Sequence, residues 1–581
     1  MARNSGTCRT SVFALVQEKT QPRTGHNLIH LATPLVWLIF PLTLCLAITR
    51  QSLWIDEGFT VWFASHSDLQ SFFRNLIGSR GAPGDPQFIF YLLHMWAWIK
   101  IFGASELSLR AANIPFAVIF ASTMSWASRR LFWSKHLWVI FCLSPFFWFY
   151  LNEARAYAAL LAFSSVASAA LVAYLVDPDR YRRNAPWYCV LGLFLAWGVH
   201  ILAFFLFPVF LILVGLTLGG RRALWLDFFR HWTRPILYSL PAFLALGAFY
   251  LCVSANGVNK SEGQPGLANF AFALYEFAGF AGLGPPRNDI RQNPSVAVFL
   301  PYWPWLLLGA FAVLAVTCFV LRRPCCAIRR NLFVSAMCGL ALAVLVSRLQ
   351  HFQVLGRHMA TLFPVLLMVG MLGPRRNPVP EKIPRMALAS LAALGVVWAI
   401  SDGRLVLLNQ YKKDSYREAC AIALAKSQQE GALIIWAADA FTAHYYGVTV
   451  DDIDLLPSPN PRINPAVLGR VVSASTWNLD QAVTHIATSS VPTVLVLSRP
   501  DTFDPDGTWR ALIREEQPVE VARLNAVSIF EWRPRTIANC SGCPRPPAAS
   551  EDLLVRNTSN STSSTPVEPL AVKPPVVSDA P

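Results

Sequence analysis

Long apolar runs, separated by short polar or basic loops, recur through the first 400 residues of the chain. Each run is close to the ~20 residues that an α-helix needs to cross the hydrocarbon core of a bilayer, so each predicts one membrane span. The pattern predicts eleven spans, at residues 31–49, 109–128, 136–150, 156–176, 187–200, 201–219, 236–253, 302–321, 332–347, 358–373 and 386–401. Because so many spans follow it, the first run is predicted to be an uncleaved anchor and not a signal peptide.

The stretch "PQFIFYLLHMWAWIKIFG" at residues 86–103 is apolar and aromatic, and it lies within a long first loop, residues 50–108. Trp, Tyr and Lys concentrate at membrane–water interfaces, so we predict a helix lying in the interface. The alternative is a twelfth span. That alternative would invert every later loop and place the basic loops outside, so we prefer the interfacial helix.

The composition changes after residue 402. Residues 415–431 have helical periodicity and end at a glycine, and "ALIIWAAD", "PTVLVLSR" and "NAVSIFEW" are typical of buried strands. These segments predict a small α/β domain at residues 405–533. The remainder, residues 534–581, is rich in Pro, Ser, Thr and Val, which predicts a disordered tail.

Composition agrees with a membrane protein. Of the 581 residues, 54% are hydrophobic and only 14% are charged, compared with about 25% charged in soluble domains. The net charge of +15 does not require a nucleic-acid partner, because Lys and Arg accumulate in the cytoplasmic loops of membrane proteins. With the arm at residues 1–30 inside, the inside segments hold about twice as many Lys and Arg as the outside loops. Eleven spans then place the C-terminal region outside. The fold class predicted is a polytopic α-helical membrane protein, with a membrane domain at 31–402 and a C-terminal extracytoplasmic α/β domain.

The predicted topology brings four polar groups of residues to the outside face. They are Asp56 with Glu57, Asp85, the turn containing Glu153, Arg155 and Tyr157, and the segment containing His351, Arg357 and His358. Arginine suits an anion such as a lipid phosphate, because its guanidinium is planar and always charged. A nearby carboxylate could take a proton from an incoming hydroxyl.

Each group also has a structural interpretation. An arginine at a helix end often only reaches the lipid headgroups, an acidic pair after a span is often a solvated loop, and Glu153 with Arg155 can simply close a turn. The occurrence of all four groups on one face favours a site. Asp56 and Glu57 could also hold a divalent cation, but no second cluster of ligands in the sequence calls for one, so the metal requirement stays open.

In order along the chain, "WIDEGFT", "DPQFIFYLLHMWAWIKIFGASELSLRAANIPFAV", "SPFFWFYLNEARAYAALLAF", "GRHMATLFPVLLMVG" and "KKDSYREACAIALAKSQQEGALIIW" resemble the membrane glycosyltransferases of the GT-C fold. More closely, they resemble members similar to dolichyl-phosphate-mannose–protein mannosyltransferases and to the aminoarabinose transferase of lipid A. The resemblance covers roughly residues 30–533, and it implies a sugar donor carried on a polyprenyl phosphate.

The resemblance also implies roles for individual residues. Asp56 matches the first-loop aspartate assigned to acceptor activation, and Glu57 is its companion in the acidic pair, so both are expected to be catalytic. Arg357 is expected near the donor phosphate, with Arg155 as a second candidate. Supporting positions are Glu106 and Arg110, which match a framework element, and Glu153 and Tyr157 of the Glu-Ala-Arg-Pro-Tyr-like turn. His351 is a supporting candidate from its place on the outside face alone, and its structural interpretation is a residue that packs or hydrogen-bonds at the interface. Two further positions depart from the family pattern: Asp85 stands where many members have His, and His358 where Tyr is common.

We therefore expect an enzyme of a bacterial inner membrane that moves a sugar from a polyprenyl-phosphate donor to an acceptor at the extracytoplasmic face. The acceptor could be a lipid, a glycan or a protein, and the sequence identifies neither it nor the sugar. The alternative is a multispan transporter or flippase of a lipid-linked substrate. Transporters generally show internal repeats and polar breaks near the middle of the membrane, and no repeat is visible here. A non-catalytic scaffold would leave Asp56 and Arg357 without a role.

Overall fold

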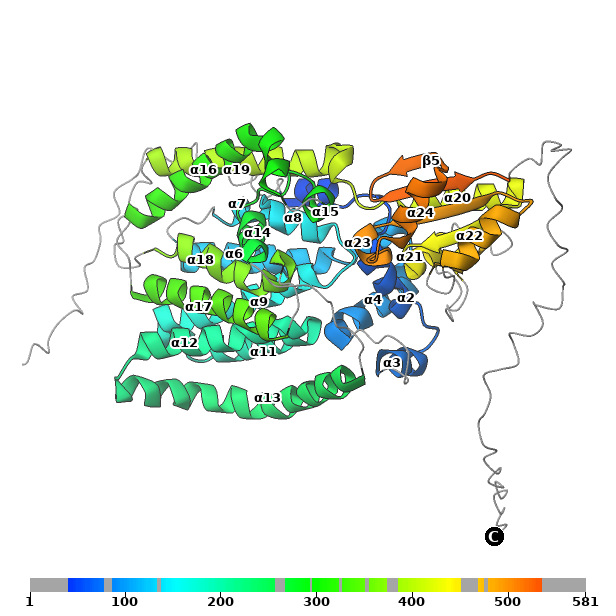
Figure 1. The fold of residues 1–581 in the computed structure, drawn as a ribbon. Helices are drawn as coiled ribbons and strands as arrows, with labels where there is room; N and C mark the ends of the chain where they lie inside the picture. The colour runs from blue at the N-terminus through cyan, green and yellow to red at the C-terminus, as the bar shows by residue number, and fades with distance from the viewer. Residues whose placement is uncertain are drawn as a thin grey trace, which may run out of the picture. The chain divides into compact units, whose positions relative to one another are not determined.

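The computed structural model describes residues 40–77, 86–132, 137–256, 267–292, 295–322, 327–350, 355–373, 385–450, 469–474 and 479–534. These residues are mostly helical up to Leu407, and a mixed sheet follows. In Figure 1 the long helices and the sheet lie side by side, with α2 (Ile55–Ala64) and α21 (Ala440–Tyr445) where they meet. The predicted arm at 1–30, and the predicted tail beyond Pro534, lie outside the described residues.

The first loop folds into short helices. Residues 40–47 are helical, and they are followed by α2, α3 (Leu69–Ile77), the 3-10 turn η1 (Pro86–Phe88), α4 (Ile89–Phe102) and α5 (Glu106–Ala111). Helix α4 ends at Gly103, whose φ of 75° suits a residue without a Cβ. Its 14 residues span about 21 Å at 1.5 Å per residue, which is less than the ~30 Å hydrocarbon core. The interfacial position predicted for this segment stays a prediction.

Seven helical segments among the described residues are long and apolar enough to cross a membrane: Glu106–Arg130, Tyr157–Val176, Ile201–Leu218, Arg222–Cys252, Val296–Val320, Ala327–Leu349 and Ala389–Leu407. They contain α5, α6 (Ile114–Arg130), α9 (Tyr157–Val176), η2 (Ile201–Phe205), α12 (Leu206–Leu218) and η3 (Val296–Tyr302), and most of α13 (Arg222–Asn256), α16 (Trp303–Arg322), α17 (Ala327–Gln350) and α19 (Arg385–Leu407).

The other predicted spans are shorter or broken in the structure. Residues 136–150 divide into α7 (Trp138–Cys142) and α8 (Pro145–Leu151), because Pro145 has no N–H to continue the helix and Ser144 before it is extended. The runs at 187–200 and 358–373 correspond to α11 (Ala185–Val199), and to η4 (Gly356–Leu362) followed by α18 (Phe363–Met371). The run at 31–49 begins outside the described residues. The count of eleven spans therefore stays a prediction.

Two short elements complete the helical part before the linker to the sheet: α14 (Leu267–Phe277) and α15 (Arg287–Gln292). Another short helix, α10 (Pro178–Tyr181), connects α9 to α11. Helix α13 is longer than expected: it starts at Arg222, so it includes residues that the sequence assigned to a loop, and it continues through Pro235 and Pro241.

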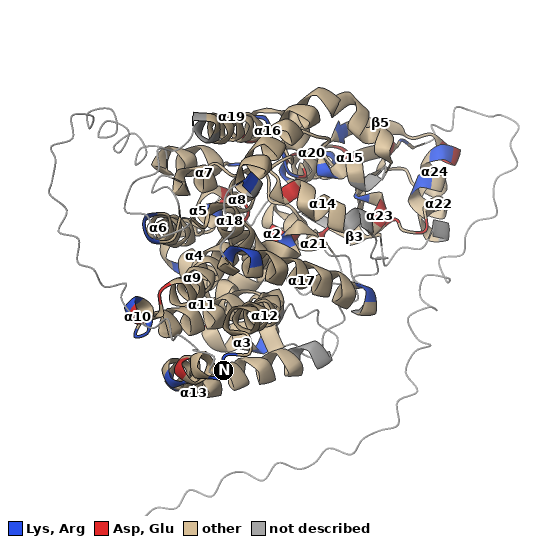
Figure 2. Cartoon of the chain, turned by 90° about the vertical axis from the view of Figure 1, so that its left-hand side faces the viewer, with Lys and Arg blue, Asp and Glu red and all other residues tan. Residues whose placement is uncertain are grey.

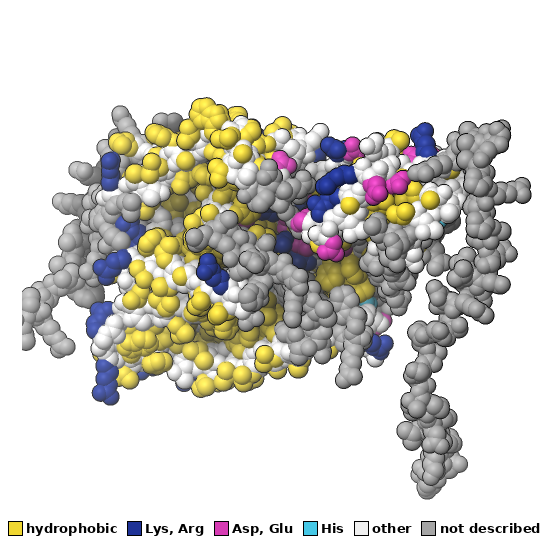
Figure 3. All heavy atoms as spheres, viewed as in Figure 1, with side chains coloured by type: hydrophobic (Ala, Val, Ile, Leu, Met, Phe, Trp, Pro, Cys, Tyr) yellow, Lys and Arg dark blue, Asp and Glu magenta, His cyan; other side chains and the backbone are white. Residues whose placement is uncertain are grey.

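The surface of the helical part separates apolar from basic residues. Figure 3 shows hydrophobic side chains over the sides of the long helices, with Lys and Arg at the helix ends farthest from the sheet. Figure 2 looks onto those ends, where basic residues lie on α6, α10 and α13. Arg129 and Arg130 in the last turn of α6 are examples. Membrane proteins concentrate Lys and Arg in this way on their cytoplasmic side. The extracytoplasmic position of the sheet stays a prediction.

The C-terminal sheet has the strand order β2-β3-β1-β4-β6-β5. Its strands are β1 (Leu433–Ala437), β2 (Val448–Val450), β3 (Gly469–Ser473), β4 (Thr493–Ser498), β5 (Val519–Leu524) and β6 (Val527–Trp532). The first four pair in parallel, and β6 pairs antiparallel with both β4 and β5. The strands predicted from "ALIIWAAD", "PTVLVLSR" and "NAVSIFEW" are β1, β4 and β6. The predicted helix is α20 (Tyr416–Glu430), which ends at Gly431 with φ 62°.

The helices α22 (Leu479–Thr488), α23 (Pro500–Phe503) and α24 (Thr508–Glu516) complete this C-terminal α/β region, together with α20 and α21. The described residues up to Pro534 belong to one compact unit, so the α/β region is packed on the helical part. Helix α21 makes the contact with α2. The Phe441 ring lies 5.2 Å from that of Phe59 and 4.9 Å from that of Trp62.

Polar contacts hold the same interface. The Tyr446 hydroxyl accepts a hydrogen bond from the Leu53 N–H at 2.7 Å, and the Tyr445 hydroxyl donates to the Ala104 carbonyl at 2.7 Å. Arg417 of α20 pairs with Glu106 at 2.8 Å. The aromatic contacts fix the α/β region to α2, which carries Asp56 and Glu57, and the polar contacts fix it to the segments on either side.

Gly58 provides a test of this packing. A Cβ at Gly58 would overlap the Thr442 hydroxyl and lie 2.8 Å from the Thr442 backbone. Gly58→Ala should therefore separate α2 from α21 and destabilise the protein by about 1–3 kcal/mol, the usual cost of overpacking. The measurement is the Tm of the purified protein in detergent. Gly215→Ala is the control, because no atom outside its own helix lies within 4 Å of its added Cβ. Equal Tm values for both variants would contradict this packing.

Candidate active site

Helix α2 presents Asp56 and Glu57 in different directions, because neighbouring residues on a helix are about 100° apart. Both lie in the first turn, where a negative charge is favoured by the helix dipole. The Glu57 side chain is completely buried, and the Asp56 side chain is 25% exposed. The two adjacent carboxylates therefore have different environments.

Glu57 is surrounded by donors. Arg110 binds it with two parallel hydrogen bonds, Nε to Oε1 at 3.1 Å and Nη2 to Oε2 at 2.9 Å. Lys413 Nζ donates to Oε1 at 2.8 Å, and so does the Ala154 N–H at 2.8 Å. Burial opposes the charge of Glu57, but Arg110 and Lys413 outweigh it and lower its pKa to about 2. Glu57 is thus an ionised carboxylate whose oxygens are already occupied.

Arg110 extends this anchor into the backbone. Its Nη1 donates to the carbonyls of Thr49 and Gln51 at 2.9 and 2.7 Å, and its Nη2 donates to that of Ser52 at 3.0 Å. The start of the first loop is therefore held to the guanidinium of a buried ion pair. The supporting role at the site expected for Arg110 stays a prediction.

Asp56 lies among cations. Arg357 Nη1 donates to Asp56 Oδ2 at 2.8 Å. Arg155 donates to the Asp56 carbonyl at 3.1 Å and to the Thr60 hydroxyl at 3.0 Å, and its guanidinium lies 4.3 Å from the centre of the Phe88 ring. Burial raises the pKa of Asp56, but the cations of Arg357 and Arg155, with a further arginine of the α/β region, outweigh it and hold the pKa below 3.8.

The turn before α9 is fixed by Asn113, which donates to the carbonyls of Leu151 and Glu153. The Glu153 side chain is only 2% exposed, and its Oε2 has no hydrogen-bond partner among the described residues. Burial raises the pKa of Glu153 to about 7, against the opposing charges of Lys413 and Arg287. It is a buried carboxyl that titrates near neutral pH.

Tyr157, His200 and His358 adjoin these groups. The rings of Tyr157 and His200 lie 5.8 Å apart, and His200 also packs against Phe88 at 4.7 Å. His358 Nδ1 accepts from the Leu355 N–H at 3.1 Å, which fixes the turn that carries Arg357. Two expected residues, Asp85 and His351, lie outside the described residues.

Several site residues were not predicted from the sequence. Lys413 comes from the linker between α19 and α20, and Arg287 from the start of α15. Arg499 comes from the end of β4, and it pairs with Asp414 at 2.7 Å. The adjacent lysines of "KKDSYREA" were a local signal for Lys413. No local pattern marks Arg287 or Arg499, because the three positions meet only through tertiary packing.

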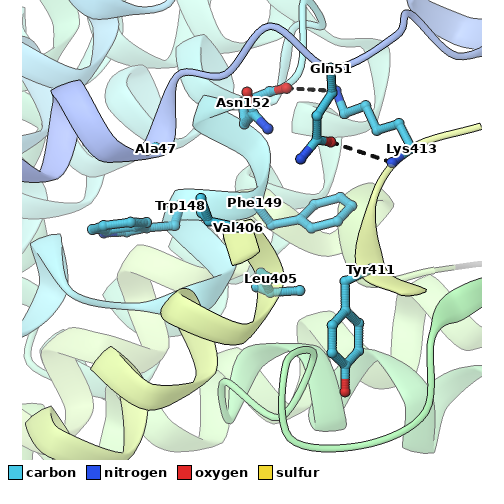
Figure 4. Close-up of a pocket in the computed structure, with 9 residues that line it drawn as sticks. All are labelled: Ala47, Gln51, Trp148, Phe149, Asn152, Leu405, Val406, Tyr411 and Lys413. Carbon is cyan, nitrogen blue, oxygen red and sulfur yellow. Dashed lines mark hydrogen bonds between the residues drawn. The ribbon is translucent and has the colours of Figure 1, made fainter. Parts of the chain in front are cut away.

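Two adjoining cavities open beside these residues. The first is lined by Gln51, Trp148, Asn152 and Lys413, among others. Figure 4 shows Lys413 bridging it, with Nζ donating to the Asn152 carbonyl at 2.5 Å and its backbone N–H to Gln51 Oε1 at 3.3 Å.

The second, called here the Trp54 cavity, is lined by Trp54, Glu153, Arg287, Lys412, Asp414 and Arg499 and shares Lys413 with the first. Four basic and two acidic residues line the Trp54 cavity, so it favours an anion.

Within the described part of the chain, no group of three or more His, Cys, Asp or Glu side chains is placed to hold a metal ion. Asp56 is paired with Arg357, and the oxygens of Glu57 are taken by Arg110, Lys413 and Ala154. The two neighbours therefore do not form a shared pair of metal ligands in this arrangement.

The fold and the site define a polytopic helical membrane protein with a C-terminal α/β region and a site of paired arginines and carboxylates where the two meet. Among solved structures the chain is similar to ArnT from Cupriavidus metallidurans, crystallised with undecaprenyl phosphate bound. The similarity covers 90% of this chain and 100% of that one, at 14% identity and a TM-score of 0.46. No family model and no curated protein matches the chain.

Removing the Glu57 carboxylate should destabilise the fold. Glu57→Ala leaves Arg110 and Lys413 buried without their partner, and breaking a buried pair in this way costs about 3–5 kcal/mol. The measurement is the unfolding of the purified protein in detergent. Glu520→Ala, which removes an exposed pair with Arg523, is the control and should change stability by less than about 1 kcal/mol. Equal stability of the two variants would show that Glu57 is no anchor.

Glu153 should make stability depend on pH. Its folded pKa of about 7 lies above the ordinary value of 4.5, so its contribution to stability is full below about 4.5 and is lost as the pH rises through about 7. We expect the Tm of the wild type to decline across this window relative to Glu153→Gln, which cannot ionise. Glu520→Gln should keep the wild-type decline. The same slope in Glu153→Gln as in the wild type would refute the assignment.

Proposed function

We propose that the protein is a membrane glycosyltransferase that moves a sugar from a polyprenyl-phosphate donor to an acceptor hydroxyl at the extracytoplasmic face. The observation that carries this proposal is the ion pair between Asp56 and Arg357, together with the hydrogen bond from Arg155 to the Asp56 carbonyl. The Asp56 carboxylate, which is partly exposed, pairs with one guanidinium, and the second guanidinium binds the backbone carbonyl of the same residue. The sequence resemblance to GT-C enzymes supports the same activity.

Arg357, with Arg155 as the second cation, binds the phosphate of the donor. Both are suited to an oxyanion because a guanidinium offers several N–H donors in one plane. Once the phosphate accepts hydrogen bonds from Arg357, that arginine neutralises Asp56 less. The pKa of Asp56 then rises, so the carboxylate becomes a better base only when the donor is bound.

In the reaction, Asp56 takes the proton of the acceptor hydroxyl while the oxygen forms a bond to the anomeric carbon. The bond between that carbon and the phosphate oxygen breaks on the opposite face, and its electron pair leaves with the polyprenyl phosphate. The configuration is inverted. The leaving phosphate gains negative charge, and preorganised arginines stabilise charge that develops in the transition state.

The residues around Asp56 and Arg357 hold these two side chains in position. Glu57 acts as a positioning residue and not as a base, because its oxygens are bound to Arg110, Lys413 and Ala154. Glu106 holds Arg417 of the α/β region, and Tyr157 packs beside Arg155 through Phe88. We assign the protein to the cell membrane, with its C-terminal α/β region outside.

Asp56→Asn should abolish transfer with little effect on folding, because the amide keeps the shape of the side chain but cannot accept the proton. The measurement is movement of radiolabelled sugar from polyprenyl phosphate to a larger acceptor, with the variants reconstituted in membranes. Asp68→Asn, an exposed carboxylate in the same loop, is the matched control and should be fully active. Full transfer by Asp56→Asn would contradict the assignment of Asp56 as the base. Label that crosses the membrane on its lipid, equally in both proteins, would favour a transporter.

Arg357→Ala should mainly impair use of the donor. We expect a KM for the polyprenyl-phosphate donor raised about tenfold or more, since a charge-assisted hydrogen bond is worth about 1.5–3 kcal/mol. Arg129→Ala is the control, because Arg129 lies in the last turn of α6, at the helix ends farthest from the sheet (Figure 2). An unchanged donor KM in Arg357→Ala would remove this residue from the donor site.

A further inference from the structure

The C-terminal α/β region meets the site through the carboxyl ends of two parallel strands. Strand β1 leads to Asp439 and β4 leads directly to Arg499. These two strands are neighbours, and the strands that follow β1 in sequence, β2 and β3, lie on its other side. In α/β sheets such a switch point between parallel strands is where ligands bind, in the crevice beyond the carboxyl ends. Here that edge is directed at α2 and the Trp54 cavity.

Arg499 has an unusual backbone. Its φ of 41° and ψ of 75° lie in the left-handed region, which residues with a Cβ rarely occupy and which is common at ligand sites. Asp414 holds its guanidinium at 2.7 Å, and the guanidinium lies 5.2 Å from the centre of the Trp54 ring. The backbone conformation and the ion pair both hold the Arg499 side chain in the wall of the Trp54 cavity.

Arg499 is one of three arginines around Trp54 with spare donors. Arg287 lines the Trp54 cavity with Arg499, and Arg357 adjoins it through Trp54, 5.5 Å from the centre of that ring. In each of the three, the buried Nε–H has no hydrogen-bond partner among the residues that the structure describes. Buried donors of this kind call for a partner, and a bound ion is one such partner.

We propose that Arg499 is an arginine of the active site, supplied by the C-terminal α/β region, and that with Arg287 and Arg357 it binds a phosphate-type oxyanion in the Trp54 cavity. Three guanidiniums from three segments match the three free oxygens of a phosphate monoester, such as the polyprenyl phosphate that remains once the sugar has left, better than the two of a carboxylate. This inference rests on the proposed function. It extends the donor site from the membrane helices to the α/β region, which becomes a part of the enzyme that binds substrate.

The phosphate could belong to the donor lipid or to an anionic acceptor, and an experiment separates the two. The full chain in lipid nanodiscs is titrated with polyprenyl phosphate, without any sugar transfer, and the acceptor KM is measured separately. If the anion is the donor phosphate, Arg499→Ala weakens binding of polyprenyl phosphate about tenfold, and Arg499→Lys weakens it less. If the anion belongs to the acceptor, binding of the lipid is unchanged and the acceptor KM rises about tenfold.

Arg523→Ala is the matched control, because Arg523 is an exposed arginine of the same α/β region, paired with Glu520. It should bind lipid and acceptor as the wild type does. Should Arg499→Ala fail to fold, as judged from its Tm, Arg499→Gln keeps most of the side-chain volume and tests the same charge.

Lipid binding and acceptor KM both within twofold of the wild type would overturn the inference while leaving the proposed function intact. A wild-type chain that binds neither polyprenyl phosphate nor inorganic phosphate would overturn both.

Discussion

The buried ion pair between Glu57 and Arg110 is the constraint on which the rest of the site depends. Arg110 lies in the last turn of α5, which leads into α6; Glu57 lies in α2, and Lys413 brings the linker of the α/β region to the same carboxylate. Three parts of the chain are joined at one fully buried charge. Such a pair adds little net stability compared with apolar packing, but losing one member is costly, so it specifies one arrangement of the three parts.

That arrangement gives the two neighbouring acidic residues different chemistry. With Glu57 turned inward, the helical geometry of α2 turns Asp56 toward Arg357 and leaves it partly exposed. The anchor and the reactive group are thus adjacent in sequence but separate in function. Lys413 has a related position, since burial and the nearby Arg110 lower its pKa to about 8 although it pairs with Glu57. The site holds an excess of positive charge that an anionic substrate would neutralise.

Much of the architecture could be predicted from local sequence. The apolar runs, the strands β1, β4 and β6, and α20 with its terminal glycine all depend on periodicity and capping within one segment. Span boundaries were less predictable, because Pro145 interrupts one run and hydrophobicity alone continues across it. In the site, Asp56, Arg155 and Arg357 stood out as polar residues at helix ends. Arg287 and Arg499 could not be predicted, because nothing in their neighbourhoods differs from an ordinary loop until the sheet packs on α2.

The role of Glu57 could not be predicted either, because it also depends on tertiary packing. As a neighbour of Asp56 it was expected to share the chemistry, and only the tertiary contacts with Arg110, Lys413 and the Ala154 N–H show that its oxygens are occupied. Sequence spacing gives the direction of two side chains on a helix, but it does not give the residues that each side chain contacts in the folded protein. The roles of adjacent carboxylates are decided by partners more than 50 residues away in the chain.

The central claim is that sugar leaves a polyprenyl phosphate at this site. It is tested most directly by incubating the purified protein in nanodiscs with a polyprenyl-phosphate sugar and a membrane extract as acceptor, and following both products. We predict that free polyprenyl phosphate appears in step with glycosylated acceptor, without any nucleotide sugar, and that the anomeric configuration of the product is inverted. A donor that stays intact in the presence of the folded protein and acceptor extract, or a product of retained configuration, would contradict the account.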